Sequence, residues 1–226
     1  MTRFADPVDA VLFDLDGTLV ETNIDFPLMR REMLALAAEH GLDSADLANL
    51  DLLAIVDTTA ESLASGGRHE EARNVRARAM RILEEIELRH ARETTEIPSA
   101  RELVARLGES GVKVGIVTRN CRRASEISLG IVGITPAVLI CREDSERHKP
   151  HPDPLMLALT ALAAAASASV MVGDHLMDVQ SGKAAGMGTI GFLRDSRPPD
   201  FFDQAQPDLV VRDLREVLRA IVGSDS

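Results

Sequence analysis

The chain has 226 residues, 45% of them hydrophobic and 27% charged, and a formal net charge of −11; this length suits one large domain, or one domain that carries an insertion. The negative charge disfavours binding to nucleic acid or to an anionic membrane, and no apolar run reaches the roughly 18 residues of a membrane span. Because only two cysteines are present and no signal peptide is evident, we expect a cytoplasmic protein without a disulfide framework.

An apolar run at residues 10–13 predicts a short buried strand that stops at the turn Asp14-Leu15-Asp16-Gly17. Gly17 would permit a positive φ or a close approach of the backbone to a ligand. At a separation of about 4 Å and an effective dielectric of about 20, the two carboxylates would repel each other by about 4 kcal/mol. Such a pair favours a cation, a shared proton or solvent, although an ordinary polar turn fits this stretch equally well.

Residues 22–95 show helical spacing and no convincing strand. Apolar stripes with spacings of three and four occur at residues 29–37, 52–63 and 72–86. The third stripe lies in a segment whose other faces carry arginine and glutamate, which indicates a long solvated helix. We therefore expect a helical unit at residues 21–95, in which these stripes form an ordinary hydrophobic core.

From residue 96 onward the sequence predicts strands that alternate with helices. A capping box at Ser99 and Glu102 should start the first of these helices. The predicted strands lie at residues 112–117, 137–140, 170–172, 188–191 and 209–211. Such alternation favours an α/β fold with a doubly wound parallel sheet. We infer a discontinuous core, residues 1–20 and 96–226, with the helical unit inserted after the first strand.

Four predicted strands and loops of this core end in polar residues. The carboxyl ends of strands in an open α/β sheet are where ligands usually bind. The residues are Asp14 and Asp16 after the first strand, Thr118 after the second, Lys149 in a charged loop, and Asp174 with Asp178 after the fourth. In this order and at these spacings they resemble the motifs of the haloacid dehalogenase-like hydrolase superfamily. The resemblance covers the whole chain and implies a Rossmann-like core with a helical cap, most similar to phosphoglycolate phosphatase-like members.

The resemblance implies phosphatase chemistry at the first turn. Asp14 would attack phosphorus and form an aspartyl-phosphate. Asp16 would protonate the leaving alkoxide and later deprotonate the attacking water. Mg²⁺ would be held by the Asp14 carboxylate, the Asp16 main-chain carbonyl and Asp174, because a hard cation prefers oxygen ligands. The ion would also let an anionic nucleophile approach an anionic substrate.

The same resemblance assigns the remaining motif residues to the phosphoryl group. Thr118 with the amides after it would bind phosphate oxygens, and Lys149 would offset charge that shifts during transfer. Asp178 would support Lys149 or metal-bound water. Many relatives place asparagine where Arg119 stands, and we hypothesise that its guanidinium binds the phosphate or a second anionic group of the substrate. Three arginines of the helical unit are either further candidates for selecting an anionic substrate or solvated surface charges: Arg30, Arg31 and Arg68.

Several alternatives to the phosphatase prediction exist. The dehalogenases of the superfamily lack an aspartate at the position of Asp16, whereas phosphomutases of the β-phosphoglucomutase-like type share it, so a mutase stays possible. A phosphoacceptor regulatory protein is disfavoured by the helical insertion, and a P-loop enzyme by the missing glycine-rich consensus. His148 and His151 have no partners at zinc-ligand spacing, and Cys121 has no evident base. The expected partner is a small phosphorylated metabolite, bound by a monomer or homodimer.

Overall fold

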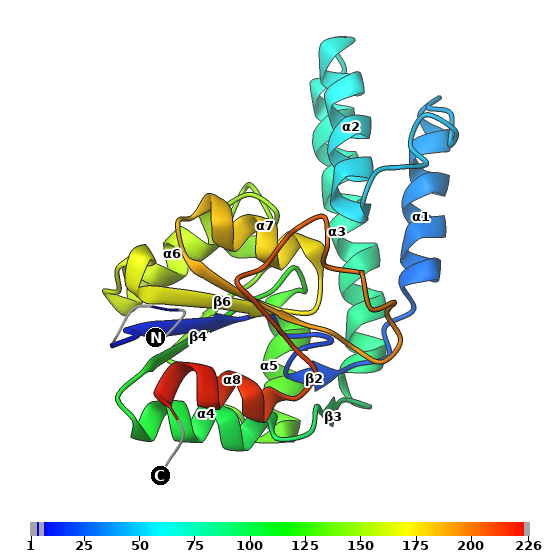
Figure 1. Cartoon of the computed structure of the whole chain (residues 1–226). Coiled ribbons are helices and arrows are strands. Elements are labelled where there is room, and N and C mark those ends of the chain that lie inside the picture. The colour runs from blue at the N-terminus through cyan, green and yellow to red at the C-terminus, as the bar shows by residue number, and fades with distance from the viewer. Residues whose placement is uncertain (1–3, 5–6, 224–226) are drawn as a thin grey trace. The chain divides into compact units, whose positions relative to one another are not determined.

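The computed structural model describes residue 4 and residues 7–223. The chain divides into two compact units, Met1–Thr22 with Ala91–Ser226, and Asn23–His90. Figure 1 shows their elements, a sheet flanked by helices in the first unit and three helices in the second. Among the described residues, no helix combines the length and apolar character needed to cross a membrane.

The first unit is built on a six-stranded sheet in which every neighbouring pair of strands is parallel. Its order is β5-β4-β1-β6-β7-β8, so β1 lies between β4 and β6 and the strand order reverses there. The prediction of a doubly wound α/β fold is confirmed. The strands are β1 (Ala10–Phe13), β4 (Lys113–Val117), β5 (Val138–Ile140), β6 (Ser169–Gly173), β7 (Gly188–Phe192) and β8 (Leu209–Val211).

Alternation along β1 assigns its side chains to two cores, because successive residues of a strand point to opposite faces of the sheet. Val11 and Phe13 pack in one core, with residues of α4 (Ala100–Glu109), α5 (Arg122–Val132) and α8 (Leu214–Val222). Ala10 and Leu12 pack in the other, with residues of α6 (Asp153–Leu162). Figure 1 shows α4 and α8 on one face of the sheet and α6 with α7 (Leu176–Ala184) on the other. Two short 3₁₀ turns complete the unit, at Arg142–Asp144 and Ala166–Ala168.

β2 (Val20–Glu21) and β3 (Thr95–Glu96) form a two-stranded antiparallel ribbon. In the sequence, β2 precedes the helical unit and β3 follows it. Strands of two residues have no periodicity, so the sequence does not predict them. The predicted capping box is wrong, because Ser99 has a left-handed φ of 69° and its side chain makes no capping hydrogen bond. The Glu96 carboxylate accepts instead from the main-chain N–H of Arg101 at 2.9 Å.

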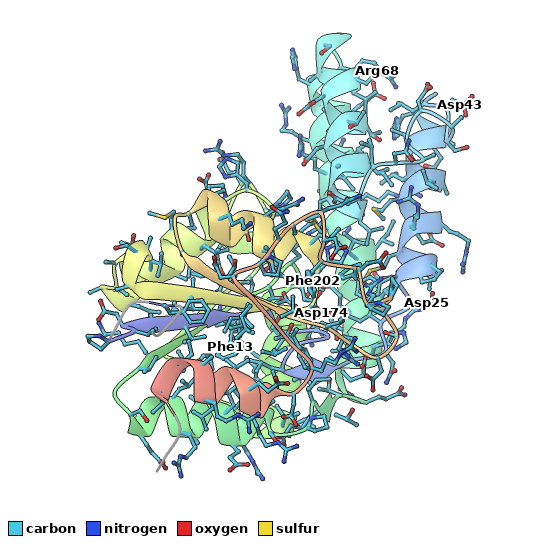
Figure 2. The ribbon with its side chains drawn as sticks, in the orientation of Figure 1. Phe13, Asp25, Asp43, Arg68, Asp174 and Phe202 are labelled. Carbon is cyan, nitrogen blue, oxygen red and sulfur yellow. The ribbon has the colours of Figure 1, made fainter. Side chains whose placement is uncertain are left out.

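The second unit consists of three helices, α1 (Phe26–Glu39), α2 (Leu52–Ser65) and α3 (His69–Ala91). The predicted apolar stripes form one buried core within it. Asp25 caps α1 through the N–H of Leu28 at 2.7 Å. Figure 2 shows Asp43 and Arg68 at one end of this unit and Asp25 at the other.

The candidate arginines of this unit differ in their surroundings. The Arg30 guanidinium donates to the carbonyls of Leu50 at 2.6 Å and Ala48 at 2.5 Å, so it is committed to closing the loop between α1 and α2 and is not a solvated surface charge. Arg68 is exposed and pairs with Glu71 at 2.5 Å. Arg30 contacts main-chain carbonyls and Arg68 contacts a neighbouring glutamate. Both contacts favour a structural role for these two side chains.

Candidate active site

The turn after β1 is held tightly against the neighbouring strand. The N–H of Asp14 donates to the carbonyl of Val172 in β6 at 2.9 Å. Gly17 has a φ of +86°, and a Cβ at this position would lie 2.5 Å from the Asp174 carboxylate. Only glycine satisfies both conditions. Thr18, the next residue, donates its hydroxyl to Asp174 at 3.4 Å, so this backbone and the carboxylate after β6 pack directly against each other.

Lys149 reaches the site from the loop before α6. Its side chain is only 3% exposed, and its Nζ donates to Asp14 Oδ1 at 2.5 Å, to Asp178 Oδ1 at 2.7 Å and to the carbonyl of Val117 at 2.8 Å. These three bonds use all the protons of the ammonium group. Burial would lower the pKa of Lys149, but the two carboxylates outweigh it and raise that pKa above its ordinary value. The lysine is therefore a fixed positive charge.

Asp178 lies in the first turn of α7, and both of its carboxylate oxygens are engaged. Oδ1 accepts from Lys149, and Oδ2 accepts from the N–H of His175 at 3.0 Å. A Cβ on Gly173 would lie 2.3 Å from the Asp178 carboxyl group, so the end of β6 needs glycine to admit this side chain. Asp178 thus contacts Lys149 directly, and its supporting role stays a prediction.

The charges at this site are unbalanced. Asp14, Asp174 and Asp178 each offer an oxygen within 4.8 Å of the others. Burial raises the pKa of Asp14 to about 8; Lys149 opposes this shift, whereas Asp178 and Asp174 add to it. Burial, with Asp178, likewise raises the pKa of Asp174 to about 7. Ionised together, the three carboxylates would carry more negative charge than Lys149 offsets, and carboxylate oxygens suit Mg²⁺. Because Asp178 is engaged, Asp14 and Asp174 are the side chains that fit such an ion.

The carboxyl of Asp16 has different surroundings from that of Asp14. Its Oδ1 accepts from the main-chain N–H of Thr22 at 3.1 Å and from the Thr22 hydroxyl at 2.7 Å. Burial raises the pKa of Asp16, while the bonds from Thr22 act in the opposite direction. Its carboxyl is outside the three-carboxylate group, and that the main-chain carbonyl of Asp16 holds an ion stays a prediction.

Thr118 and Arg119 form the turn after β4. Thr118 is buried, and its hydroxyl accepts from the N–H of Asn120 at 3.1 Å. Arg119 donates from Nη1 to the Met177 sulfur at 2.9 Å. A thioether is a weak acceptor, so a phosphate oxygen would be a stronger partner for this guanidinium. That these two residues bind phosphate stays a prediction. Cys121 caps α5 by accepting from the N–H of Ala124 at 3.4 Å.

Four residues near the site were absent from the sequence reasoning. Thr18 and Thr22 contact the site carboxylates, and His175 caps α7 by accepting from the N–H of Met177 at 3.3 Å. The fourth, Arg194, donates to the carbonyl of Gly17 at 2.7 Å. Thr18 belongs to the first motif and could have been noted there. His175 acts locally at the start of α7, but histidine is not among the preferred N-cap residues. Thr22 and Arg194 carry no local signal, because their contacts depend on how the chain folds.

Comparison with known proteins identifies the family. Residues 11–192 match the model of the haloacid dehalogenase-like hydrolases. The chain belongs to this family. It is 29% identical over 222 residues to the pyrophosphatase PpaX of Bacillus pumilus, with 96% of this chain and 98% of that protein covered. It is 31% identical over 215 residues to the N-acetylmuramic acid 6-phosphate phosphatase of Pseudomonas aeruginosa, with 92% of each chain covered.

A similar fold occurs among solved structures. A haloacid dehalogenase family hydrolase of Deinococcus radiodurans, crystallised with phosphate and sodium, superimposes with a TM-score of 0.63 at 24% identity. The match covers 96% of each chain. The resemblance inferred from the four motifs is therefore confirmed, as are the hydrolase class and the fold. The protein is an enzyme of a family whose relatives, as named above, cleave phosphate groups.

Proposed function

We propose that the protein is a Mg²⁺-dependent phosphatase that hydrolyses a small phosphate monoester through an aspartyl-phosphate on Asp14. The observation that carries this proposal is the buried contact of Lys149 with Asp14 and Asp178, directly after the central strand β1. A purely structural acid in a turn would need neither a buried lysine nor a second acid that fixes that lysine. The side chain of Asp14 is also still 13% exposed, which leaves it open to a substrate.

In the first half of the reaction, Asp14 attacks phosphorus while the bond to the leaving oxygen breaks. Lys149 already holds Asp14 Oδ1 at 2.5 Å, so the nucleophile needs little reorganisation before it reacts. The same ammonium group offsets negative charge on the transferring phosphoryl. Asp16 gives its proton to the leaving oxygen, which departs as an alcohol.

In the second half, Asp16 takes a proton from a water molecule that attacks the phosphorus of the aspartyl-phosphate. The bond to Asp14 breaks, and inorganic phosphate leaves. Asp14, Asp174 and the main-chain carbonyl of Asp16 would hold Mg²⁺. When bound, the ion supplies positive charge between the anionic nucleophile and the anionic substrate. Thr118 and Arg119 bind phosphate oxygens, and Asp178 keeps Lys149 in place.

The substrate is proposed only as a class. The relatives are named for pyrophosphate and for a sugar acid phosphate, so both an anhydride and a monoester belong in a test panel, together with phosphoglycolate. We assign the helical unit, residues 21–95 in the sequence and Asn23–His90 in the structure, as a cap that selects the substrate. A phosphomutase gains no support, because the mutase-like structure that matches is 20% identical and shows the fold alone. The proposed setting is the cytoplasm, with the protein as a monomer or homodimer.

The test uses p-nitrophenyl phosphate with purified protein. Hydrolysis should require Mg²⁺, and Asp14→Asn should abolish it, because an amide is a poor nucleophile. Asp200→Asn, an exposed acid far along the chain, serves as the matched control and should keep wild-type activity. Full activity in excess chelator, or in Asp14→Asn, would overturn the proposal. The substrate panel is then run on the same preparation.

A further inference from the structure

Arg194 lies two residues beyond the end of β7 and belongs to none of the four motifs. Its side chain is 23% exposed. Nη1 donates to the main-chain carbonyl of Gly17 at 2.7 Å, and Nη2 pairs with the carboxylate of Glu21. These partners are 177 and 173 residues away in the sequence. One guanidinium thus joins the loop after β7 to the segment that follows the first strand.

Both contacts fall on the segment that controls the Asp16 carboxyl. Gly17 directly follows Asp16, and Glu21 directly precedes Thr22. Thr22 donates its N–H and its hydroxyl to Asp16 Oδ1, at 3.1 and 2.7 Å. Arg194 therefore contacts the residue after Asp16 and the residue before Thr22, and Thr22 is the residue that orients the Asp16 carboxyl. Movement at either end would change the direction of the carboxyl.

The loop that carries Arg194 is itself anchored. The N–H of Leu193 donates to the carbonyl of Val211 at 2.8 Å, and the Leu193 side chain is buried. Phe202, labelled in Figure 2, packs in the same small apolar cluster as Leu193. A Cβ on Gly191 would lie 2.9 Å from the Phe202 ring, so this ring sits close on β7. Arg194 therefore extends from a loop that is held by packing and hydrogen bonding, so its guanidinium can restrain the groups that it contacts.

We propose that Arg194 is a positioning residue for Asp16: by fixing the backbone between Gly17 and Glu21, it keeps the Asp16 carboxyl where it protonates the leaving oxygen. The two hydrogen-bonded ends of the guanidinium are committed to these protein groups, so Arg194 acts through Asp16 and not as a phosphate ligand. This inference rests on the proposed phosphatase function. It adds a residue that the four family motifs do not contain.

The test compares two substrates that differ in their need for a proton. p-Nitrophenolate leaves without protonation, whereas the alkoxide of glycerol 2-phosphate requires it. Arg194→Ala should lower kcat/KM for glycerol 2-phosphate by about 30-fold, part of the 10²–10⁴ that general acid catalysis contributes. For p-nitrophenyl phosphate the loss should stay below about threefold. Arg194→Lys keeps the charge but cannot bridge two acceptors as a fork does, so it should lie between these values.

Two controls separate positioning from other effects. Arg197→Ala removes a nearby guanidinium, which lies 4.7 Å from the centre of the Phe201 ring, and should leave the ratio of the two kcat/KM values unchanged. In an Asp16→Asn background, Arg194→Ala should cause no further loss on glycerol 2-phosphate, because the coupling between the two sites is then already broken. An additive loss there would overturn the inference.

Three further outcomes would overturn it. One is an equal loss on both substrates, another is unchanged activity, and the third is full rescue of Arg194→Ala by excess Mg²⁺, which would place the effect at the ion. If Arg194→Ala melts below the assay temperature, Glu21→Gln and Arg194→Lys decide by the same substrate ratio. A wild-type protein that hydrolyses neither substrate would refute the proposed function itself, which is a distinct result.

Discussion

Replacement of Lys149 by methionine tests the charge balance at the centre of the site. The lysine is buried and donates to Asp14, to Asp178 and to the carbonyl of Val117. Methionine has a similar length but neither charge nor donor, so the change removes the three interactions and keeps most of the packing. What remains is a pair of buried carboxylates that face each other without a cation.

The expected cost follows from this geometry. Removing one partner of a buried ion pair destabilises a protein by about 3–5 kcal/mol. Protonation limits this cost, because burial already raises the pKa of Asp14 to about 8 with Lys149 in contact, and loss of the lysine raises it further. A group whose pKa is higher in the folded than in the unfolded chain loses its stabilising effect as the pH rises through the folded value. The cost should therefore be about 3–4 kcal/mol at about pH 8 and about 1–2 kcal/mol at about pH 5.5.

Urea unfolding in the presence of chelator measures this difference. The chain contains no tryptophan and no tyrosine, so circular dichroism at 222 nm should report the transition. Lys113→Met is the matched control, because Lys113 is exposed and donates only to main-chain carbonyls, at 2.7 and 3.1 Å. It should cost less than about 1 kcal/mol at either pH. A loss for Lys149→Met that is below about 1 kcal/mol at about pH 8, or equal at both pH values, would refute the reasoning.

Three further predictions concern the same site. Gly173→Ala should destabilise the protein by about 1–3 kcal/mol, because the added Cβ would lie 2.3 Å from the Asp178 carboxyl group; an unchanged melting temperature would contradict this. Since burial raises the pKa values of Asp14 and Asp174 to about 8 and about 7, metal-free protein should lose stability as the pH rises from about 4 to about 8. Mg²⁺ should then raise the melting temperature more at about pH 8 than at about pH 5, and equal shifts would argue against an ion at these groups. Arg119→Ala should raise KM for the best substrate about 10-fold with little change in kcat; an unchanged KM would remove Arg119 from the binding site.

The sheet could be predicted because its signals are local. The apolar runs before Asp14, Thr118 and Asp174 each mark a buried strand, and the helices between them force parallel pairing. The β2–β3 ribbon had no such signal. Its two-residue strands are stabilised by antiparallel pairing between residues 20–21 and 95–96, which lie on either side of the whole helical unit. No window of sequence contains both.

Candidate site residues could be found only where a motif carries them. Lys149 is one lysine in a charged loop, and its place in the order of motifs singled it out. Arg30 and Arg194 look alike in the sequence, yet Arg30 closes a loop through carbonyls whereas Arg194 joins Gly17 to β2. The difference depends on which carbonyls the fold brings within reach. Ser99 shows the same limit at a helix start, because its spacing to Glu102 suits a capping box whereas its backbone adopts a left-handed conformation that the spacing does not reveal.

The two aspartates of the first turn repel each other unless their surroundings differ, and here they do. Asp14 contacts a buried ammonium group, whereas Asp16 accepts from the neutral amide and hydroxyl of Thr22. Burial raises the pKa of Asp14, and Lys149 opposes that shift without cancelling it. Further positive charge near Asp14 would favour its ionised form, and the proposed Mg²⁺ would supply that charge. Among the described residues, no ammonium or guanidinium group pairs with the Asp16 carboxyl, and burial raises its pKa. This contrast suits the proposed division of attack and proton transfer between two residues of one turn.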